Sequence, residues 1–308
     1  MNVTGLELLL GVAGDLLVGD PRRLPHPVRG FGRVAGRLER VWRKAPFAMR
    51  LAGAGLWLSA VGLACLAVWL SLRILPRPWI TVYWIFSLLA VRDLDRHAGV
   101  VIKALDAGDL AEARRGTAMM VGRDTESLEE KEILRAVFES GAENLNDAAI
   151  APLFYLALAG PLGMAAYKAV NTLDSMVGYL NPRYREFGWA AARMDDLLNW
   201  MPARLSAMLV WLCALMPGFD FARSVRVTLR DAHRQPSPNS GYPEAAVAGA
   251  LGVRLGGLNY YGGNASRKEF LGDPIRPLDR SLYSRLRWLI YGPALAMTAA
   301  VSMVLPWL

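Results

Sequence analysis

The chain has 308 residues, a net charge of +8 and a hydrophobic content of 54%, and its mean hydropathy is +0.24. It is more apolar than an ordinary soluble enzyme of this size, whereas 20% of charged residues is too many for a bundle of plain membrane spans. The composition therefore predicts a membrane protein with substantial polar loops. It argues against nucleic acid as a partner, because no basic stripe with interleaved aromatic residues occurs.

The N-terminal part of the chain combines a short apolar stretch with a basic segment. Residues 4–19 are a candidate membrane span, although Asp15 interrupts them. Short loops rich in lysine and arginine stay in the cytoplasm, so the segment after residue 20 is predicted to lie on that side. Its basic residues are Arg22, Arg23, Arg29, Arg33, Arg37, Arg40, Arg43 and Lys44.

The most apolar run lies near residues 50–74 and predicts a membrane-spanning helix, since about 20 apolar residues cross a bilayer. Pro76-Arg77-Pro78 predicts a turn. Residues 78–91 continue the apolar character over a shorter length. These elements are expected to form a helical hairpin whose two outer ends face the cytoplasm.

Residues 92–147 form a polar region that predicts cytoplasmic or interfacial helices. Asp109 precedes a run of good helix formers, which indicates an N-cap. Ser127 and Glu130 have the spacing of a capping box. The apolar stripe that follows them at helical spacing indicates packing and not a site.

Two further apolar segments, near residues 149–166 and 204–217, are short, and a C-terminal run near residues 288–308 is long enough to span. Gly160-Pro161 breaks the first of them, which predicts either a kinked span or a re-entrant pair. The re-entrant pair is favoured, because a single crossing would place the polar groups of one site on opposite sides. The predicted fold class is all-α, a polytopic integral membrane helical protein in which residues 1–308 form a single membrane-embedded catalytic unit.

Three sets of acidic and amide residues lie at helical spacing beside these apolar segments. The first set contains Glu143, Asn144 and Asp147, which lie close to one helix face. Carboxylate and amide oxygens are the hard ligands that Mg²⁺ prefers, so this set predicts a metal or substrate site. The alternative is a solvated helix start.

The second set shares one helix face and contains Lys168, Asn171, Asp174 and Ser175. Lysine can meet a phosphate as a point charge, while the aspartate can hold a metal ion or orient an amine. The alternative is a Lys–Asp pair that only satisfies itself.

The third set contains Arg193, Asp195, Asp196 and Asn199. It lies beside an apolar segment, and carboxylates at a lipid boundary are costly unless they bind something. This favours a functional role. The alternative is a ladder of surface ion pairs.

Two turn sequences lead into helices, Gly122-Arg123-Asp124-Thr125 and Ser237-Pro238-Asn239-Ser240-Gly241. Free backbone N–H groups at such a helix start can hold phosphate. Neither sequence matches the lysine-containing phosphate-binding loop, so any ATP site is predicted to be of an unfamiliar type. Residues 255–263 predict a flexible, aromatic-bearing loop that approaches a large flat ligand, or a simple connection.

Longer motifs run through the chain and are densest between Arg92 and Gly263. They are Gly19-Asp20-Pro21, His26-Pro27-Val28, Gly122-Arg123-Asp124, Ala142-Glu143-Asn144, Asn171-Thr172-Leu173-Asp174-Ser175-Met176-Val177-Gly178-Tyr179, Phe187-Gly188-Trp189-Ala190-Ala191-Ala192-Arg193-Met194-Asp195-Asp196, Ser237-Pro238-Asn239-Ser240-Gly241 and Leu255-Gly256-Gly257. With these motifs in this order, the sequence resembles the adenosylcobinamide-phosphate synthase (CobD/CbiB) family. Ser240, where the family often has alanine, and Met194, where it often has leucine, are small departures.

The resemblance implies an enzyme of cobalamin biosynthesis that joins (R)-1-amino-2-propanol phosphate, or aminopropanol, to a propionate carboxylate of adenosylcobyric acid. The implied reaction is an amide formation that uses ATP and Mg²⁺ and gives adenosylcobinamide phosphate. The implied location is the cell membrane, which a multi-pass chain crosses with its active site on the cytoplasmic side. Membrane lipid and either a second copy of the chain or other corrinoid-pathway enzymes are the expected partners.

Residue roles follow from this resemblance as hypotheses. The catalytic set is Asp174, Lys168, Asn171, Asp195 and Asp196. The set that binds substrate or phosphate is Arg123, Asp124, Glu143, Asn144, Arg193, Ser237, Asn239 and Gly241. The metal set is Asp147, Asp174 and Asp196.

Rival interpretations come from other protein classes. A transporter is expected to contain more long spans than this chain. A membrane sensor of the AmpE type is expected to lack the full motifs at residues 171–176 and 237–239. A lipid phosphotransferase requires a D-G-x₂-A-R pattern, which this sequence does not contain.

Overall fold

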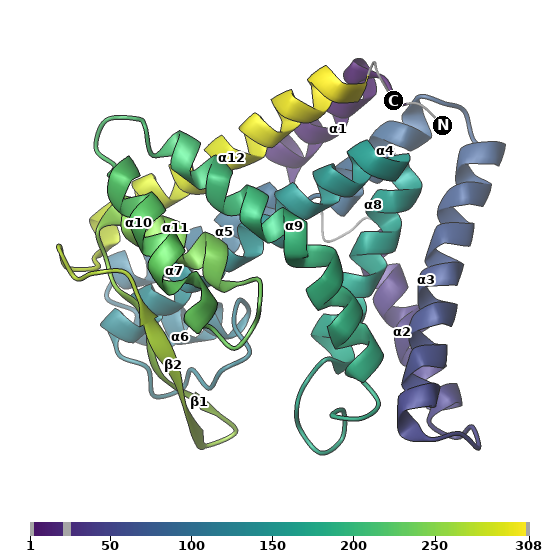
Figure 1. Cartoon of the computed structure of the whole chain (residues 1–308), viewed down its shortest axis with the longest axis horizontal. Helices are drawn as coiled ribbons and strands as arrows, with labels where there is room; N and C mark the ends of the chain where they lie inside the picture. The colour runs from purple at the N-terminus through teal and green to yellow at the C-terminus, as the bar shows by residue number, and fades with distance from the viewer. Residues whose placement is uncertain (1–2, 21–25, 306–308) are drawn as a thin grey trace. The chain divides into compact units, whose positions relative to one another are not determined.

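The structure, a computed structural model, describes residues 3–20 and 26–305 (Figure 1). It is mostly helical, as predicted, and its described residues also contain one two-stranded sheet. Contacts divide the chain into two compact units. Unit 1 contains Met1–Ala90, Ala151–Asn199 and Thr298–Leu308, and unit 2 contains Val91–Ile150 and Trp200–Met297. The single catalytic unit stays a prediction, and Pro21, Arg22, Arg23 and the end of the C-terminal apolar run lie outside the described residues.

Unit 1 is a helical bundle built around α3. It consists of α1 (Gly5–Val18), α2 (Pro27–Trp42), α3 (Met49–Ile74), α4 (Trp79–Leu88), α8 (Ala151–Val177), the first part of α9 (Trp189–Cys213) and the end of α12 (Tyr283–Val304). Helix α3 packs against α2 and α8, and α1 packs against α4. The core between them contains Ala35, Ala52, Leu56, Ala60, Leu173, Val177, Phe187 and Ala191. The four alanines in this core let the helix backbones approach closely.

Two helices of the described chain are long and apolar enough to cross a membrane, judged by length and composition alone. They are Met49–Ile74 and the stretch Glu130–Val177, which contains a break at Ala159 and Gly160. The first coincides with the run predicted near residues 50–74. Helix α1 has 14 residues and α4 has 10, so neither reaches the ~20 residues that a crossing needs. The multi-pass arrangement and the hairpin over residues 50–91 stay predictions.

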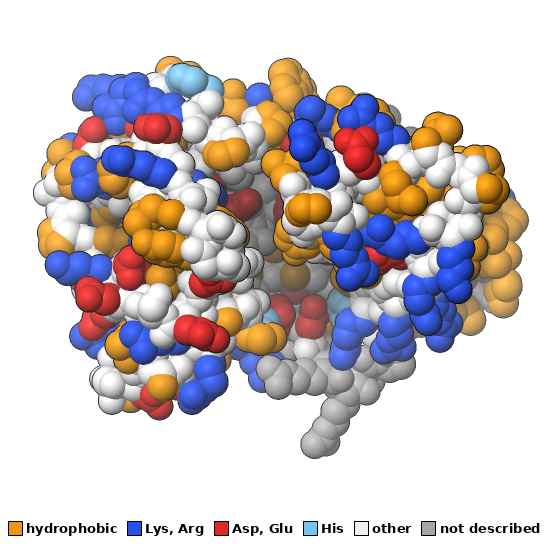
Figure 2. All heavy atoms as spheres, turned by 90° about the horizontal axis from the view of Figure 1, so that it is seen from below, with side chains coloured by type: hydrophobic (Ala, Val, Ile, Leu, Met, Phe, Trp, Pro, Cys, Tyr) orange, Lys and Arg blue, Asp and Glu red, His pale blue; other side chains and the backbone are white. Residues whose placement is uncertain are grey.

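One part of the surface of unit 1 is strongly basic. Figure 2 shows Lys and Arg side chains gathered over this unit. The exposed basic residues of α2, of the start of α3 and of the loop after α8 are Arg29, Arg33, Arg37, Arg40, Arg50, Arg183 and Arg185. Several of the arginines predicted to mark a cytoplasmic segment therefore lie in the same unit as the apolar helix α3.

Helix α8 is interrupted at Ala159 and Gly160, as Gly160-Pro161 predicts. Gly160 has φ 63° and ψ −157°, a conformation that a residue with a Cβ adopts only with strain. Pro161 follows and has no N–H to donate to the preceding turn. The break is confirmed, while the preference for a re-entrant pair stays a prediction.

Unit 2 combines helices with a β-hairpin whose second strand is mostly exposed. It contains α5 (Val91–Asp106), α6 (Leu110–Ala118), α7 (Glu130–Leu145), α10 (Phe221–Asp231), α11 (Gly241–Leu251), β1 (Leu255–Tyr261), β2 (Asn264–Leu271) and the remaining parts of α9 and α12. Three short turns complete it: a π turn (Asn146–Ile150) and two 3₁₀ turns (Ala232–Arg234 and Arg280–Leu282). Helix α11 packs against α10, α7 and β2.

Two helix starts in unit 2 test the predicted caps. Asp109 is the N-cap of α6, and its carboxylate accepts a hydrogen bond from the backbone N–H of Glu112, as predicted. The capping box predicted at Ser127 and Glu130 is wrong. Helix α7 begins at Glu130, and Glu129 and Glu132 form its capping box. The helix begins later than predicted because a turn at residues 126–127 first buries Leu128.

The loop predicted at residues 255–263 is wrong, because this segment is strand β1 and the turn after it. β1 pairs antiparallel with β2, and Tyr261 lies opposite Asn264. Gly262 and Gly263 form the two-residue turn with φ 56° and 78°, and positive φ at both positions matches the strand twist of a hairpin. The strands carry side chains into the site described below.

Gly53 allows a close contact between α3 and the backbone that precedes α9 in unit 1. A Cβ at this position of α3 would overlap the carbonyl oxygen of Phe187, which is backbone and cannot rotate away. We therefore expect Gly53→Ala to lower the free energy of unfolding by about 2–3 kcal/mol, measured as a lower Tm in detergent. Gly62→Ala in the same helix is the matched control, because a Cβ there meets nothing within 4 Å. Equal melting temperatures for the two variants would contradict this contact.

Candidate functional site

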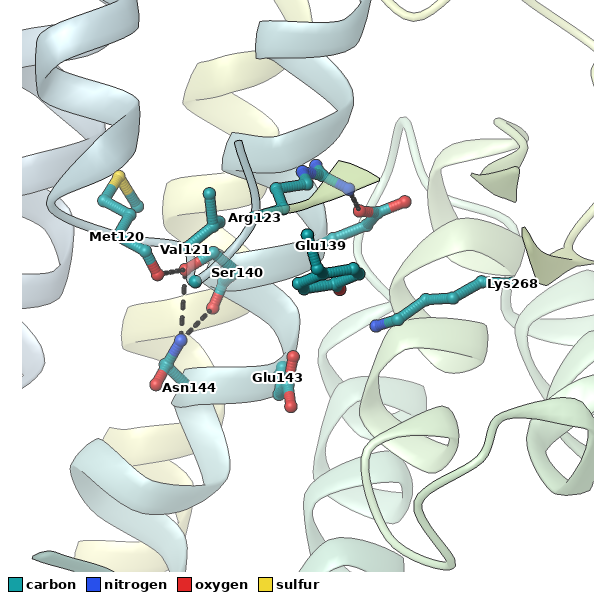
Figure 3. A pocket seen from close by; sticks show the side chains of 10 residues that line it. Met120, Val121, Arg123, Glu139, Ser140, Glu143, Asn144 and Lys268 are labelled. Atoms are coloured by element: carbon teal, nitrogen blue, oxygen red, sulfur yellow. Dashed lines mark hydrogen bonds and ion pairs between the residues drawn. The ribbon is translucent and has the colours of Figure 1, made fainter. Parts of the chain in front are cut away.

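A polar pocket in unit 2 has a volume of about 290 Å³ (Figure 3). Three segments line it: the loop after α6, one face of α7 and the β-hairpin. The lining residues are Met120, Val121, Gly122, Arg123, Glu139, Ser140, Glu143, Asn144, Tyr261 and Lys268. The α7 residues are three and four apart, which places them on one face of the helix. The structure thus brings together Arg123, Glu143 and Asn144 from the predicted binding set.

The most buried ion pair of the pocket joins Arg123 to Glu139. Nη1 of Arg123 donates to Oε2 of Glu139 at 2.8 Å and also contacts Oδ1 of Asn259. Oε1 of Glu139 accepts from the backbone N–H of Gly256 at 2.8 Å and from Arg135 at 3.2 Å. The carboxylate therefore fixes the loop after α6 and the start of β1 to helix α7.

Glu244 adjoins this pocket from α11 and is completely buried. Neither carboxylate oxygen accepts a well-formed hydrogen bond within the described chain. Burial, and next the negative charge of Glu143, raise the pKa of Glu244 well above its ordinary value. Lys268 and, more weakly, the Ser240 hydroxyl act in the opposite direction. An acid kept in such surroundings is typical of a functional site.

Lys268 extends from β2, and its ammonium group points to the side of the pocket on which Glu143 lies (Figure 3). Among the described residues it has no hydrogen bond and no ion pair within 4.0 Å. Burial alone would lower the pKa of Lys268. The charges of Glu244, Glu143 and Glu139 outweigh burial and raise this pKa, so the side chain carries a positive charge at neutral pH.

Asp124, predicted to bind substrate or phosphate, closes the turn of the hairpin. Its carboxylate accepts from the backbone N–H groups of Gly262 at 3.0 Å and Gly263 at 2.7 Å. Its own N–H donates to the carbonyl oxygen of Tyr260 at 2.8 Å. Asp124 therefore positions the hairpin, and its contact with a substrate stays a prediction.

Ser237, Asn239 and Gly241 have structural partners in unit 2. The Ser237 hydroxyl accepts from the backbone N–H groups of Asn239 at 3.2 Å and Ser240 at 3.3 Å, which are among the groups predicted to hold phosphate. Asn239 accepts from Arg204 at 3.3 Å. A Cβ at Gly241 would overlap the carbonyl oxygen of Ala232. Their predicted role toward phosphate stays a prediction.

A second polar cluster lies in unit 1, between α8 and α9. Oδ1 of Asp195 accepts from the amide of Asn171 at 3.4 Å, and Oδ2 accepts from the amide of Asn199 at 2.9 Å. The amide oxygen of Asn199 accepts from the hydroxyl of Tyr167 at 2.9 Å. Of the predicted catalytic set, Asn171 and Asp195 are thus brought into contact. Lys168 is buried in the same helix as Asn171.

The remaining predicted residues are distributed over both units. Arg193 lies 3.8 Å from Asp196, and both side chains are substantially exposed, which agrees with a surface ion pair. Asp174 is in α8 of unit 1, whereas Asp147 is in the π turn of unit 2, where it accepts from Asn146 at 2.9 Å. The described part of the chain contains no group of three or more His, Cys, Asp or Glu side chains that could hold a metal ion. The magnesium site stays a prediction.

Comparison with known proteins shows relatives along almost the whole chain. A family model described as "CobD/Cbib protein" matches residues 8–290. The chain belongs to the CobD/CbiB family. The cobalamin biosynthesis protein CobD of Pelobacter propionicus is 48% identical, and the match covers 98% of this chain and 94% of that protein. CobD of Geobacter metallireducens is 45% identical over 98% and 97%, and CbiB of Salmonella typhi is 44% identical over 93% of each. No solved structure matches the chain.

The family resemblance is thereby confirmed, but the motifs do not include two residues that line the pocket, Glu139 and Lys268, or Glu244, which adjoins it. Glu244 had a usable signal, because it is the only charged residue in an alanine-rich segment that the helix buries. Glu139 lies one helical turn before Glu143, so spacing could have included it. Lys268 stands between Arg267 and Glu269 in a polar strand, and no local pattern distinguishes it.

The turn contacts of Asp124 give a local prediction. We expect Asp124→Ala to loosen the hairpin, because two backbone N–H groups lose their acceptor, at a cost of about 1–2 kcal/mol. Amide hydrogen exchange of residues 255–271 should accelerate, while exchange in α3 should be unchanged. Unchanged exchange in the hairpin would show that the carboxylate does not hold this turn.

Burial of Glu244 gives a prediction on stability and pH. A carboxyl group with a raised pKa binds more protons in the folded than in the unfolded chain, so its contribution to stability falls as the pH rises above 4.5. Glu244→Gln removes this group, and we expect the variant to melt above the wild type at neutral pH. The difference in Tm should shrink as the pH approaches about 4.5. A variant that melts below the wild type at neutral pH would contradict an unpaired carboxylate.

Proposed function

We propose that this protein is a membrane-bound enzyme of cobalamin biosynthesis that forms an amide in an ATP-dependent reaction. The amine would come from aminopropanol phosphate or aminopropanol, and the carboxylate from a propionate side chain of adenosylcobyric acid. The observation that supports this is membership of the CobD/CbiB family through residues 8–290. Relatives named as cobalamin biosynthesis proteins match nearly end to end.

The chemistry of the reaction explains why ATP is required. A carboxylate is a poor acyl donor, so a propionate oxygen would first take the γ-phosphoryl group of ATP and release ADP. The neutral amine would then attack the carbonyl carbon, the bond from this carbon to the phosphate oxygen would break, and the nitrogen would lose a proton to a base. Such a sequence needs positive charge beside the phosphate oxygens and a carboxylate beside the amine.

Residues of this chain fit these needs. Arg123 in the pocket of unit 2 and Lys168 in unit 1 are suited to the phosphate oxygens. Asp195 is suited to accept a proton or to bind a metal, because two amide groups fix its carboxylate. Bound Mg²⁺ would neutralise phosphate oxygens, and with a nucleotide it needs only one or two protein carboxylates. Asp174 and Asp196, both in unit 1, are two such carboxylates. A magnesium site of this kind does not require the group of three acids that the described residues lack.

A multi-pass position in the cell membrane, with the active site on the cytoplasmic side, belongs to this proposal. Met49–Ile74 and Glu130–Val177 have the length and composition of membrane-spanning helices. The exposed arginines gathered over unit 1 (Figure 2) support a cytoplasmic side for the ends of α2 and α3.

Product formation tests the proposal. Purified protein in lipid nanodiscs, given adenosylcobyric acid, ATP, Mg²⁺ and aminopropanol phosphate, should form adenosylcobinamide phosphate, detected by mass spectrometry, and none without ATP. Asp195→Asn should lower kcat about 10²-fold or more, because it keeps the shape and removes the charged acceptor. Glu126→Gln, at an exposed position, is the control and should keep wild-type turnover.

Other outcomes would reject all or part of the proposal. No amide from the wild type would reject the ligase activity and return the protein to the sensor or transporter class. Wild-type turnover by Asp195→Asn or Asp174→Asn would remove that residue from the catalytic set.

A further inference from the structure

Buried polar atoms in the lining of the unit 2 pocket and directly behind it lack hydrogen-bond partners among the described residues. Arg123 is 7% exposed, and its Nε and Nη2 have no partner among the described residues. The same holds for Nδ2 of Asn259 and for both carboxylate oxygens of Glu244. Buried polar groups are nearly always hydrogen-bonded. Unsatisfied donors and acceptors in one place point to a ligand that carries both.

The charges around the pocket indicate what kind of ligand fits. Glu139 already binds Arg123 and Arg135. Two further acidic side chains, Glu143 in the lining and Glu244 beside it, lie near the single ammonium group of Lys268, which forms no close ion pair with them. A purely anionic ligand would meet these carboxylates, and a purely cationic one would meet Lys268 and Arg123. A zwitterion whose two charges are separated by a few bonds satisfies both.

The size of the pocket limits the ligand further. About 290 Å³ lies at the small end of ligand-binding pockets. A corrinoid or a nucleotide is too large to enter it, whereas an amino alcohol phosphate of a few carbon atoms fits. The lining is mostly polar, as a ligand that is charged at both ends requires.

We propose that this pocket binds the amine substrate as a zwitterion, with its ammonium group against Glu143 and Glu244 and its phosphate group against Lys268 and Arg123. This inference rests on the proposed function for the identity of the ligand and adds the residues that hold it. Lys268 points into the pocket from the side of the hairpin (Figure 3), and the free Nε and Nη2 of Arg123 are donors suited to phosphate oxygens.

The same arrangement makes the pocket select the phosphate ester over free aminopropanol. The free amino alcohol would leave the donors of Lys268 and Arg123 without an acceptor. Sites built to hydrogen-bond a group discriminate strongly against ligands that lack it. Lys268 is thus inferred to determine specificity, and Glu244 to bind the ammonium group.

Steady-state kinetics with two substrates test this inference. For aminopropanol phosphate, Lys268→Met and Glu244→Gln should each raise KM about 10–100-fold, while KM for ATP and for adenosylcobyric acid changes less than about twofold. With free aminopropanol, Lys268→Met should leave KM unchanged, because no phosphate group is lost. Lys131→Met and Glu126→Gln, at exposed positions, are the matched controls and should behave as the wild type.

Calorimetry with the purified protein separates binding from catalysis and from unfolding. Aminopropanol phosphate should bind the wild type, and both pocket variants should weaken this binding at least about tenfold. Isopropyl phosphate, which lacks the amine, should be affected by Lys268→Met and not by Glu244→Gln. The Tm of Glu244→Gln is measured in parallel, and a value at or above that of the wild type shows that its lost affinity does not come from unfolding.

The results that overturn the inference differ from those that overturn the function. A wild type that forms the amide, together with pocket variants whose KM for aminopropanol phosphate is unchanged, rejects the inference alone. A preference of the wild type for free aminopropanol also rejects it. If the wild type forms no amide, the proposed function fails, and calorimetry then tests the pocket separately. No binding of aminopropanol phosphate rejects the inferred binding site, whereas binding that Glu244→Gln weakens supports it.

Discussion

The buried carboxylate of Glu139 is the interaction on which the site in unit 2 depends. It joins three pieces of chain, because it binds Arg123 after α6, Arg135 in its own helix and the backbone of Gly256 at the start of β1. Loss of this carboxylate would leave guanidinium groups in the interior without a counter-charge, which is strongly destabilising. Once β1 is fixed at Gly256, the register of the hairpin places Lys268 opposite the next residue, Gly257.

The polar groups at the pocket lower the stability of the folded chain and are suited to bind a ligand. Glu244 is a buried acid whose carboxyl oxygens accept no well-formed hydrogen bond, and the buried donors of Arg123 and Asn259 also lack partners among the described residues. A protein selected only for stability would replace such an acid by an apolar or amide residue. Buried polar groups without partners concentrate at functional sites, where a bound ligand supplies the missing partners. Atoms of this kind also occur at Trp57, Thr81 and Gln235, but Arg123, Asn259 and Glu244 together contribute five of them in and beside one pocket.

The sequence predicts the structural features that depend on neighbouring residues. It does not predict those that depend on contacts between distant segments. The N-cap at Asp109, the break at Gly160 and the apolar helix near residues 50–74 follow from local chemistry. The pocket depends on contacts such as Glu139 with Gly256, which are 117 residues apart, and spacing within a helix cannot reveal them. The prediction of a flexible loop at residues 255–263 overlooks the two-residue turn signal of Gly262-Gly263. Glycines beside aromatic residues also occur in flexible loops, so their presence alone does not identify a strand. The Ser237 turn was interpreted as open N–H groups, whereas its own hydroxyl occupies two of them.

The hairpin has a further property that follows from its size. Within the described chain its sheet has two strands, so each strand has an outer edge whose backbone groups pair with no other strand. Such an edge can recruit a strand of another molecule and start aggregation, and charged side chains oppose this. β2 carries Arg267, Lys268 and Glu269 in succession. The charges that shape the pocket on one side therefore also help to keep neighbouring copies of the protein from joining their sheets.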